Sequence, residues 1–443
     1  MRRRIANWGN YPVVDAEVIV PSGVGAARDA VAGSAPLIPR GMGRCYGDSS
    51  LSRTVLSTGR WNRMRSFREG DGLLSCEAGV SLGEIVETFG PRGWFLPVTP
   101  GTKFVTVGGA IASDVHGKNH HRDGSFSKHL VGMEILSGNG EVVTCSREER
   151  EDLFHATCGG MGLTGVILSA AFRLVPVETG WIRQETIKTV DLDETMKRFE
   201  ESVGWSYSVA WIDCLAKGRG TGRSVLLLGE HATRDELARA GRGRGASDGW
   251  ATKRIDVPFF FPERALNRWS ARAFNAAYYG HVPKGRHASL VDCDAFFYPL
   301  DKVLHWNRVY GKRGFVQYQC VLPIRTSRDG LKRILRAVSE GDHPPFLTVL
   351  KLMGGEAGLL SFPMEGYTLA MDIPIRDGLF PYLDRLDGIV SAEGGRLYLA
   401  KDARMRREMF EAGYPEAGAF REIRKRYGGE GRFASLQSER VGL

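Results

Sequence analysis

One stretch, residues 99–121, limits what this chain can fold into more than any other part of the sequence. It reads TPGTKFVTVGGAIASDVHGKNHH, so a β-branched run at 104–107 meets a glycine pair and small residues follow. The pattern predicts a buried strand, a tight turn at Gly108–Gly109 and the first turn of a closely packed helix. Unpaired N–H groups and the positive end of a helix dipole at such a turn suit a phosphate or pyrophosphate. An ordinary strand–turn–helix is an equally good interpretation of this stretch alone.

Two more glycine-rich turns lie beside predicted strands. Residues 40–50, RGMGRCYGDSS, follow a short strand at 36–39, and residues 158–165, CGGMGLTG, lead into a strand that runs to Val175. The first turn lacks the GK[ST] ending of a P-loop, and it lacks the helix and the ribose-binding acid of a GxGxxG fingerprint. Three glycine-rich turns within the first 178 residues indicate a backbone wrapped around an extended, phosphate-bearing cofactor.

The character of the sequence changes after Pro176, and a length of 443 residues favours more than one domain. Helical patterns at 192–203, 329–339 and 379–392 accompany strand patterns at 209–212, 224–228, 314–323, 346–353 and 367–375. We predict an α+β protein with a cofactor-binding domain at 1–178 and a substrate-binding domain at 179–395 built on a largely antiparallel sheet. A C-terminal segment, 396–443, is expected to contribute the end of a strand at 394–402 and then helices.

Charge and cysteine usage exclude some functions. The net charge is +9, but the 60 basic and 51 acidic residues are interspersed, and no nucleic-acid-binding signature is present, so we expect no nucleic-acid partner. Seven scattered cysteines without a CxxC pair indicate reduced thiols and no structural zinc. The N-terminus lacks the apolar region of a signal peptide, and no apolar run is long enough to span a bilayer. A cytoplasmic protein is therefore expected.

Three histidines in the central stretch could be read as a metal cluster. His116 and His120 have the i,i+4 spacing of helical metal ligands, and His121 follows. Gly117 and Asn119 interrupt that spacing with poor helix formers, and no catalytic acid accompanies it. We therefore expect no metal site.

Four segments together resemble a known family. PRGMGRCYGD, the stretch 99–121, CGGMGLTGVI and LYLAKD resemble FAD-linked oxidoreductases of the vanillyl-alcohol oxidase / p-cresol methylhydroxylase (VAO/PCMH) type. The similarity is greater still to the flavoprotein subunits of decaprenylphosphoryl-β-D-ribose 2′-epimerases, and it includes FVQYQ, VLKLMG and SFPMEGYTLAMDIPI. The resemblance implies a two-domain FAD-binding fold of the PCMH/VAO type with an inserted substrate domain, and a C-terminal segment that returns to the FAD domain.

The resemblance also implies an activity. It is the FAD-dependent oxidation of the 2′-hydroxyl of a polyprenyl-phosphoryl ribose to the 2′-keto sugar, the first half of epimerisation to the arabinose form. An FAD-dependent sugar or alditol oxidase that acts on a soluble carbohydrate is the alternative, and a flavin-free binding protein with the same fold is a third.

The expected FAD is non-covalent, because Arg44 stands where many members of the wider family carry the histidine that links to the flavin. Its pyrophosphate is expected near Gly41, Gly43 and Gly108–Gly109. The residues that the resemblance assigns to FAD binding are Arg40, Gly41, Met42, Gly43, Arg44, Cys45, Tyr46, Thr99, Gly101, Thr102, Val107, Gly108, Gly109, Ala112, Ser113, His116, Gly117, Asn119, Gly162, Gly165 and Ile167.

Alcohol oxidation of this kind needs a base for the hydroxyl proton and a cation beside the developing alkoxide. The resemblance assigns these tasks to Lys401, His116 and Tyr46, with Lys401 stabilising the alkoxide and the base left open among the three. The residues expected to bind the substrate are Lys118 and Lys351 for phosphate or hydroxyls, Gln317 and Gln319 for orienting hydrogen bonds, and Trp211.

Partners follow from the same resemblance. A separate NAD(P)H-dependent short-chain reductase is expected to complete the epimerisation. The basic charge and the segment VPFFFP at 257–262 suit peripheral contact of the protein with the inner face of a membrane, although three phenylalanines between prolines also suit a core. Two features depart from the mycobacterial pattern. Ala370 replaces a cysteine that thiol-trapping inhibitors capture, which implies insensitivity to such capture, and the ending FASLQSERVGL differs.

Overall fold

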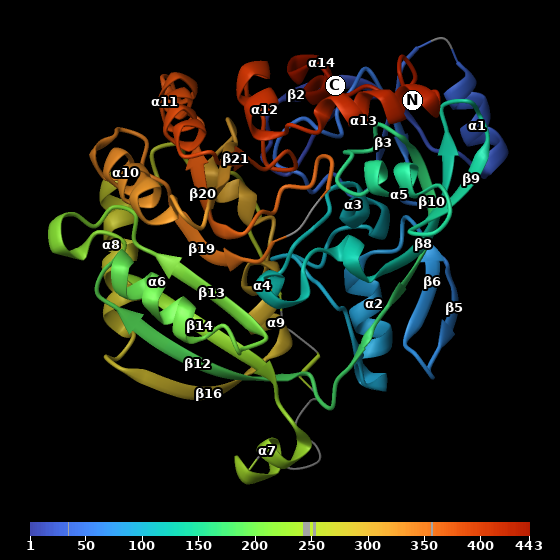
Figure 1. The fold of residues 1–443 in the computed structure, drawn as a ribbon. Coiled ribbons are helices and arrows are strands. Elements are labelled where there is room, and N and C mark those ends of the chain that lie inside the picture. The colour runs from blue at the N-terminus through green and yellow to red at the C-terminus, as the bar shows by residue number, and fades with distance from the viewer. Residues whose placement is uncertain (34, 242–248, 251–253, 356–357) are drawn as a thin grey trace.

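The N-terminal part of the chain builds two sheets (Figure 1). The computed structural model describes all residues except 34, 242–248, 251–253 and 356–357. A four-stranded sheet has the order β1-β2-β4-β3 and a five-stranded antiparallel sheet the order β5-β6-β10-β8-β9. Their strands are β1 (Arg2–Ala6), β2 (Val13–Ile19), β3 (Ile38–Arg40), β4 (Thr54–Ser57), β5 (Met64–Arg68), β6 (Leu73–Glu77), β8 (Leu130–Ser137), β9 (Val142–Ser146) and β10 (Gly165–Arg173).

Short helices connect these strands. Helix α2 begins with a capping box, in which Ser81 Oγ accepts from Glu84 N at 3.1 Å and Glu84 Oε2 accepts from Ser81 N at 2.7 Å. The helices of this part are α1 (Val24–Ala32), α2 (Leu82–Phe89), α3 (Val107–Ala112), α4 (His120–Asp123) and α5 (Glu151–Thr157), with 3₁₀ turns at η1 (Gly90–Arg92) and η2 (Phe126–His129).

Residues 104–107 do not form the predicted strand, and the unpaired N–H groups predicted at the following turn are not found. Thr106 makes an isolated bridge with Ser81, and its hydroxyl accepts from Gly109 N at 3.1 Å as the N-cap of α3. Val107 N and Gly108 N donate to Val80 O and Ala78 O, each at 2.8 Å. The β-branched run is therefore used for capping and for docking the helix onto its neighbours, and the start of α3 has no donors left for an anion.

An eight-stranded antiparallel sheet forms the second part, in the order β16-β12-β14-β13-β19-β20-β18-β21. Its strands are β12 (Trp181–Thr189), β13 (Tyr207–Ile212), β14 (Ser224–His231), β16 (Arg286–Asp292), β18 (Phe315–Pro323), β19 (Leu347–Met353), β20 (Gly366–Pro374) and β21 (Arg396–Leu397). One face is covered by α6 (Leu192–Glu201), α10 (Ser327–Glu340) and α11 (Leu379–Ala392), which bury leucines and isoleucines against it. The α+β class and the largely antiparallel sheet are as predicted.

The remaining elements border this sheet or follow it. Two small strand pairs, β7 with β11 and β15 with β17, lie outside the main sheets. These elements are β7 (Trp94–Phe95), β11 (Val175–Pro176), η3 (Gly218–Gly220), α7 (Arg234–Arg239), β15 (Ile255–Asp256), α8 (Arg268–His281), α9 (Cys293–Phe297), η4 (Pro299–Lys302), β17 (Val303–Leu304), η5 (Trp306–Tyr310), α12 (Arg407–Gly413), α13 (Ala417–Arg426) and α14 (Leu436–Val441).

The strand predicted at 394–402 ends early. Only Arg396–Leu397 pair with β18, and the chain then turns, with Lys401 N and Asp402 N both donating to Tyr398 O. The tail that follows lies against the N-terminal part, since Leu37 N donates to Arg432 O at 2.9 Å and Ala434 N donates to Leu37 O at 3.0 Å. Figure 1 shows α13 and α14 beside the first strands. The domain boundaries at 178 and 395 stay a prediction.

All seven cysteines are free thiols. In the part of the chain that the structure describes, no group of three or more His, Cys, Asp or Glu side chains is placed to hold a metal ion. None of the helices among the same residues has both the length and the apolar character needed to cross a bilayer.

A buried ion pair joins the loop after β7 to α9. Lys103 Nζ lies 2.8 Å from Asp294 Oδ1, and the side chains are only 1% and 5% exposed. The backbone N–H of Lys103 donates to Asp301 Oδ2 at 2.8 Å, and the hydroxyls of Thr99 and Tyr298 are 2.7 Å apart. These contacts connect segments that are far apart in the sequence, so they fix the N-terminal loops against the second part.

Lys103→Met is expected to lower the free energy of unfolding by about 3 kcal/mol, because it leaves the buried Asp294 carboxylate without its cation. Urea unfolding monitored by circular dichroism measures the change. Arg313→Met, which breaks an exposed ion pair with Asp377, is the matched control and should leave stability nearly unchanged. Equal effects of the two substitutions would contradict a structural role for the buried pair.

Candidate active site

A cavity of about 530 Å³ lies between the glycine-rich turns and the open face of the large sheet. The sheet contributes alternate residues to its wall, such as Gln317 and Gln319 on β18 or Leu347, Val349 and Lys351 on β19. Because side chains alternate across a strand, residues two apart face the same side. The face of the sheet opposite α6, α10 and α11 therefore forms one wall of the cavity.

The cavity brings together residues from the whole length of the chain. All of the predicted catalytic and substrate-binding residues line it: Tyr46, His116, Lys118, Trp211, Gln317, Gln319, Lys351 and Lys401. All of the residues predicted to bind FAD also line it, apart from two. Val107 is fully buried in the core, and Asn119 donates to Pro97 O at 2.8 Å behind the wall, so these two support the site from outside.

The loop after β3 is suited to the pyrophosphate of FAD. Five consecutive backbone N–H groups along the cavity find no acceptor among the described residues: those of Gly41, Met42, Gly43, Arg44 and Cys45. Gly43 has a φ of 63°, in the left-handed region that glycine adopts without strain and that forms anion-binding backbone nests. Unpaired backbone donors are rare in folded proteins, so this loop is built to receive acceptors from a ligand. The residues present therefore fit FAD.

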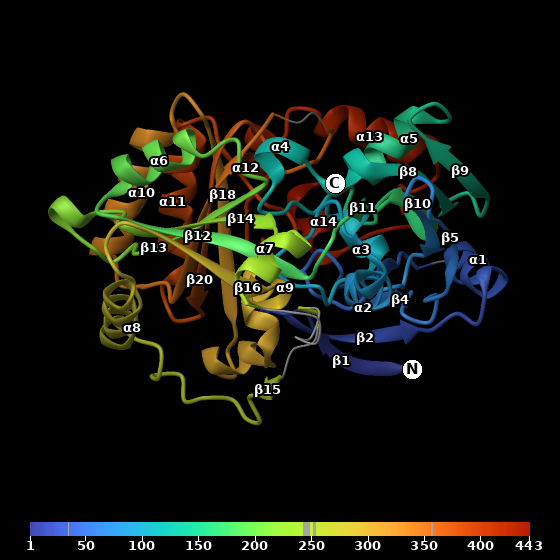
Figure 2. The same ribbon diagram turned by 90° about the horizontal axis from the view of Figure 1, so that it is seen from below.

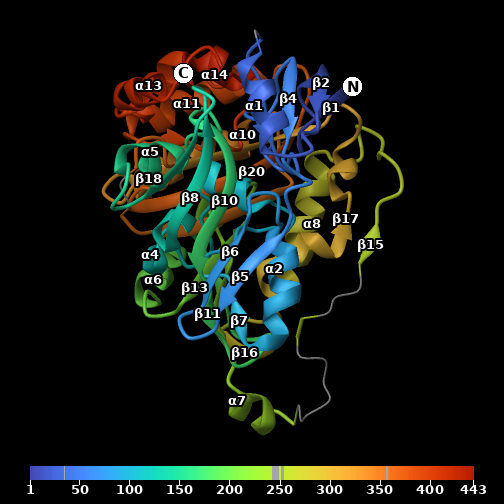
Figure 3. The same cartoon turned by 90° about the vertical axis from the view of Figure 1, so that its right-hand side faces the viewer.

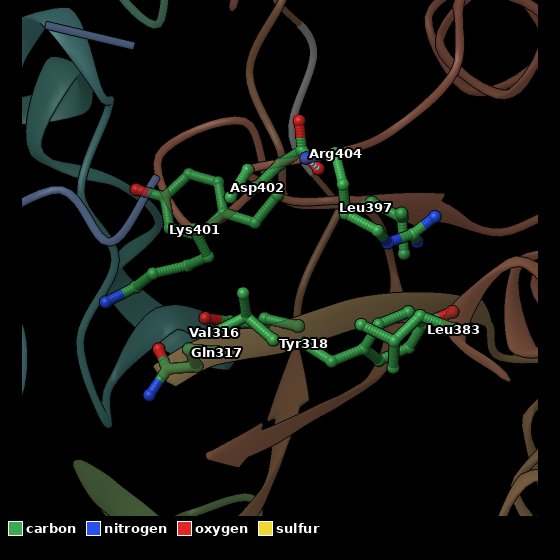
Figure 4. Close-up of a pocket in the computed structure, with 11 residues that line it drawn as sticks. Val316, Gln317, Tyr318, Leu383, Leu397, Lys401, Asp402 and Arg404 are labelled. Carbon is green, nitrogen blue, oxygen red and sulfur yellow. Dashed lines mark hydrogen bonds between the residues drawn. The ribbon is translucent and has the colours of Figure 1, made fainter. Parts of the chain in front are cut away.

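Lys401 extends into the cavity from the turn after β21. Its ammonium lies 3.8 Å from the centre of the Tyr46 ring, and Figure 4 shows its side chain and that of Gln317 reaching the same side from different elements. Within the described chain, Lys401 Nζ has neither a hydrogen-bond acceptor nor a carboxylate at ion-pair distance. Burial lowers the pKa of Lys401, and the nearby charge of Asp372 opposes that shift.

The C-terminal helix α14 holds this turn in place. Asp402 Oδ1 accepts from Met405 N at 2.7 Å, while Asp402 Oδ2 lies 3.0 Å from Arg440 Nη2. Gln437 Nε2 donates to Leu399 O at 2.8 Å. Gln437 and Arg440 belong to the ending FASLQSERVGL, which departs from the mycobacterial pattern. They thus hold Leu399 and Asp402, the residues on either side of the Ala400–Lys401 pair.

His116 is buried and uncharged. Gln319 Nε2 lies 3.1 Å from His116 Nε2, and an amide nitrogen can only donate, so the imidazole accepts there and carries its proton on Nδ1. Burial, and then the charge of Lys351, hold the pKa of His116 well below its ordinary value. Its Nδ1 is buried without a partner in the described chain, and an unpaired buried donor is costly unless a ligand accepts from it.

Two further lysines line the cavity in different environments. Lys118 Nζ donates to the carbonyl oxygens of Phe296 and Phe297, so the wall already holds its ammonium. Lys351 has no hydrogen-bond or ion-pair partner within the described residues. Burial lowers the pKa of Lys351 to about 8 and that of Lys118 to about 7. Lys351 is the lysine that remains available to a phosphate.

Tyr46 and Trp211 complete the polar surface of the cavity. Burial raises the pKa of Tyr46 well above its ordinary value, and the charge of Asp372 adds to the shift, so the phenol stays protonated. Trp211 Nε1 is buried without an acceptor in the part of the chain that the structure describes. Both groups can therefore donate hydrogen bonds to a bound ligand.

Sequence analysis missed Asp372, which lies behind the site on β20. It pairs with Gln317 across the sheet, accepts from Gln317 Nε2 at 2.6 Å, and is 1% exposed. Burial raises its pKa, and the Gln317 hydrogen bond and the Lys401 charge lower it. The sequence does hold a signal for Asp372, because it is the one acidic residue within the apolar strand pattern AMDIPI. A carboxylate in such a strand is expected to be buried, and a buried carboxylate needs polar partners nearby.

Tyr398 was also missed as a site residue, although it lies in the recognised LYLAKD segment. Its hydroxyl donates to Ser113 O at 2.8 Å, and its ring centre is 5.2 Å from that of His116. Ala370, the position of the mycobacterial cysteine, lines the same cavity.

Comparisons with known proteins agree with this site. Residues 23–146 match the family model of an FAD binding domain. A decaprenylphosphoryl-β-D-ribose oxidase of Mycolicibacterium smegmatis is 37% identical over 456 residues, which cover 100% of this chain and 98% of that protein. An uncharacterized protein in the mprA 5′ region of Streptomyces coelicolor is 36% identical over 82% of this chain and 100% of its own length. Delta(24)-sterol reductase of Rattus norvegicus is 31% identical over 99 residues, 22% of this chain and 19% of that protein.

Proposed function

This chain belongs to the family of decaprenylphosphoryl-β-D-ribose oxidases, and we propose that it oxidises the 2′-hydroxyl of a polyprenyl-phosphoryl ribose to the 2′-keto sugar with FAD as cofactor. The observation that carries the proposal is one cavity holding both a loop of N–H groups and two partly buried lysines, Lys351 and Lys401, all without hydrogen-bond partners among the described residues. The loop suits the cofactor's pyrophosphate, and the lysines suit a phosphate and a developing alkoxide.

The cofactor, when bound, accepts the hydride from the sugar carbon. Two of the three candidate bases are excluded. Tyr46 stays protonated because its pKa is raised, and the unprotonated nitrogen of His116 already accepts a hydrogen bond from Gln319. Lys401 has a lowered pKa and no acceptor of its own, so its neutral amine can take the hydroxyl proton and its ammonium can then stabilise the oxyanion. His116 Nδ1 and the Tyr46 hydroxyl serve as donors that orient the sugar.

Asp372 is a positioning residue in this scheme. Its carboxylate holds the Gln317 amide at 2.6 Å and favours the protonated form of Lys401. Lys351, whose ammonium has no partner within the described residues, binds the phosphate of the substrate. Aromatic residues in the cavity wall, Phe274, Tyr278 and Trp306, suit the first units of the polyprenyl chain.

Asp372→Asn is expected to move the acidic limb of the pH profile for flavin reduction to lower pH, by roughly one unit. The charge of Asp372 raises the pKa of Lys401, so removing that charge lowers the pKa and leaves the amine neutral down to a lower pH. Anaerobic stopped-flow absorbance across pH measures the rate. An unchanged limb, or one displaced to higher pH, would contradict the coupling of these two groups.

The product implies a partner. Epimerisation requires the 2′-keto group to be reduced again, and this site removes a hydride, so we assign the second step to a separate NAD(P)H-dependent reductase. The lipid tail of the substrate further implies peripheral contact of the enzyme with a membrane.

The test is an anaerobic absorbance spectrum of the purified flavoprotein before and after addition of a prenyl-phosphoryl ribose analogue with a short, soluble prenyl chain. Bleaching of the flavin band is expected, with a free alditol as the negative control. Bleaching by the alditol alone would favour the soluble-carbohydrate oxidase, and a protein that neither contains nor takes up FAD would overturn the proposal.

A further inference from the structure

The three phenylalanines of VPFFFP are exposed and do not belong to the core, although Val257 at the start of the segment is buried. Phe259 is 62% exposed, Phe260 and Phe261 are each 37% exposed, and Trp269 at the start of α8 is 79% exposed. These four residues are called the aromatic rim below. Large apolar side chains that gather on one exposed surface mark an interaction site more often than chance exposure does.

Helix α8 continues this apolar surface. Trp269, Ala273 and Ala277 recur at i, i+4 and i+8 and are all exposed, so they lie on one outward side of the helix. The inward side is anchored by a polar residue, because Asn275 is buried and donates to Asp213 Oδ1 at 2.7 Å. A helix on the surface of a water-soluble protein normally buries its apolar side chains and exposes its polar ones.

The phenylalanines of the aromatic rim are attached to a segment that lines the cavity, and α8, which carries Trp269, lines it too. Val257 N donates to Leu304 O at 3.0 Å and Phe261 N donates to Arg308 O at 2.9 Å, which fixes both ends of the phenylalanine run. Next to that segment, Trp306 contacts Trp8 with ring centres 5.6 Å apart, and both line the cavity. On α8, Tyr278 lines the cavity and is also 37% exposed.

Basic residues lie on the same face. Figures 2 and 3, which view the molecule from two perpendicular directions, both place β1, β15 and α8 along one side. The side chains of Arg2, Arg3 and Arg4 on the edge strand β1 are exposed, and none of them forms an ion pair within the described residues, although Asp15 and Glu17 lie opposite on β2. Arg264 is exposed between the phenylalanines and α8, next to Glu263.

We propose that the aromatic rim inserts into the interfacial region of a bilayer containing anionic lipid, with Arg2–Arg4 and Arg264 on the lipid phosphates, so that the cavity mouth meets the lipid substrate at the membrane. Exposed Trp, Phe and Tyr flanked by arginines are the composition of interfacial anchors. The choice of a lipid over a second copy of this chain rests on the proposed function, since the cavity beside the rim would take a polyprenyl phosphate.

The experiment measures binding of the FAD-loaded full-length enzyme to sedimenting vesicles of phosphatidylcholine, with or without phosphatidylglycerol. The wild type is expected to sediment with the mixed vesicles and less in high salt. The variant Phe259→Ser/Phe260→Ser/Phe261→Ser is expected to lower the partition coefficient at least about tenfold, because it removes the apolar groups that enter the bilayer. Arg2→Ser/Arg3→Ser/Arg4→Ser is expected to weaken binding to mixed vesicles but not to pure phosphatidylcholine.

The matched control removes three exposed apolar residues elsewhere, as Val142→Ser/Val190→Ser/Val203→Ser, and should bind vesicles like the wild type. Flavin absorbance and bleaching by the short-chain analogue should be unchanged in all of these variants, since none of the altered residues lines the cavity.

Failure of the wild type to bind vesicles, with bleaching intact, overturns docking alone. Failure of bleaching with vesicle binding intact overturns the proposed substrate alone. A wild-type dimer that the phenylalanine variant dissociates would assign the surface to a second copy and overturn docking.

Discussion

Lys401→Ala is expected to slow reduction of the bound flavin by substrate by about 10² to 10⁴-fold while leaving the flavin bound. The substitution removes a cavity group whose pKa is lowered by burial, which finds no hydrogen-bond acceptor among the described residues, and whose ammonium lies 3.8 Å from the centre of the Tyr46 ring. Without it, the hydroxyl proton has no acceptor, and the developing negative charge has no adjacent cation. Single-turnover absorbance under anaerobic conditions measures the rate of this step directly.

Two companion variants separate the roles that a lysine can have there. Lys401→Arg keeps the positive charge but has no neutral form at accessible pH, so it should restore little activity if Lys401 is the base and much more if it only stabilises the alkoxide. Lys351→Ala should raise the substrate concentration needed for half-saturation and leave the saturated rate close to that of the wild type. A Lys401→Ala enzyme that reduces its flavin at nearly the wild-type rate would refute the assignment.

Gly41→Ala is expected to yield a protein purified with little FAD, with an affinity lowered by about a hundredfold or more, or about 2.7 kcal/mol. An added Cβ would lie 2.3 Å from Thr106 Oγ1 and 3.1 Å from its methyl carbon. Thr106 cannot move freely, because its hydroxyl caps α3 at Gly109 N. The loop must therefore shift, and the five unpaired N–H groups of residues 41–45 lose their alignment.

Flavin content after purification and fluorescence titration of the apoprotein with FAD measure the effect. Gly388→Ala is the matched control, because its Cβ would meet nothing within 4 Å on the exposed side of α11. That variant should retain FAD and gain slight helix stability. Full flavin content in the Gly41→Ala protein would show that the loop does not hold the cofactor as proposed.

The local parts of the fold could be predicted because their causes lie within a few residues. Ser81 and Glu84 have the spacing of a capping box and form one, and the Ser-Gly-Asn-Gly sequence at 137–140, typical of a turn, connects β8 to β9 as a hairpin. The alternation of Gln317 and Gln319 was likewise sufficient to place both side chains on one face of β18. The same local reasoning failed at Thr106, where strand propensity was outweighed by capping and by packing of α3 against Val80 and Ala78.

The site depends on contacts between distant residues, and these were decided by tertiary structure. Gln317 and Asp372 are 55 positions apart and meet only because β18 pairs with β20, and Lys103 and Asp294 are 191 positions apart. The pKa of Lys401 follows from burial beneath a sheet that no local pattern describes.

The sequence by itself thus determined the α+β class, the glycine-rich turns, the FAD family and the catalytic and substrate-binding candidates that line the cavity. Tertiary structure decided which N–H groups remain free among the described residues, that Lys351 and Lys401 have no partner there whereas Lys118 does, and that Phe259–Phe261 face outward. The physical reason is that hydrogen-bond satisfaction and burial depend on every neighbour in space, whereas capping and alternation depend only on neighbours along the chain.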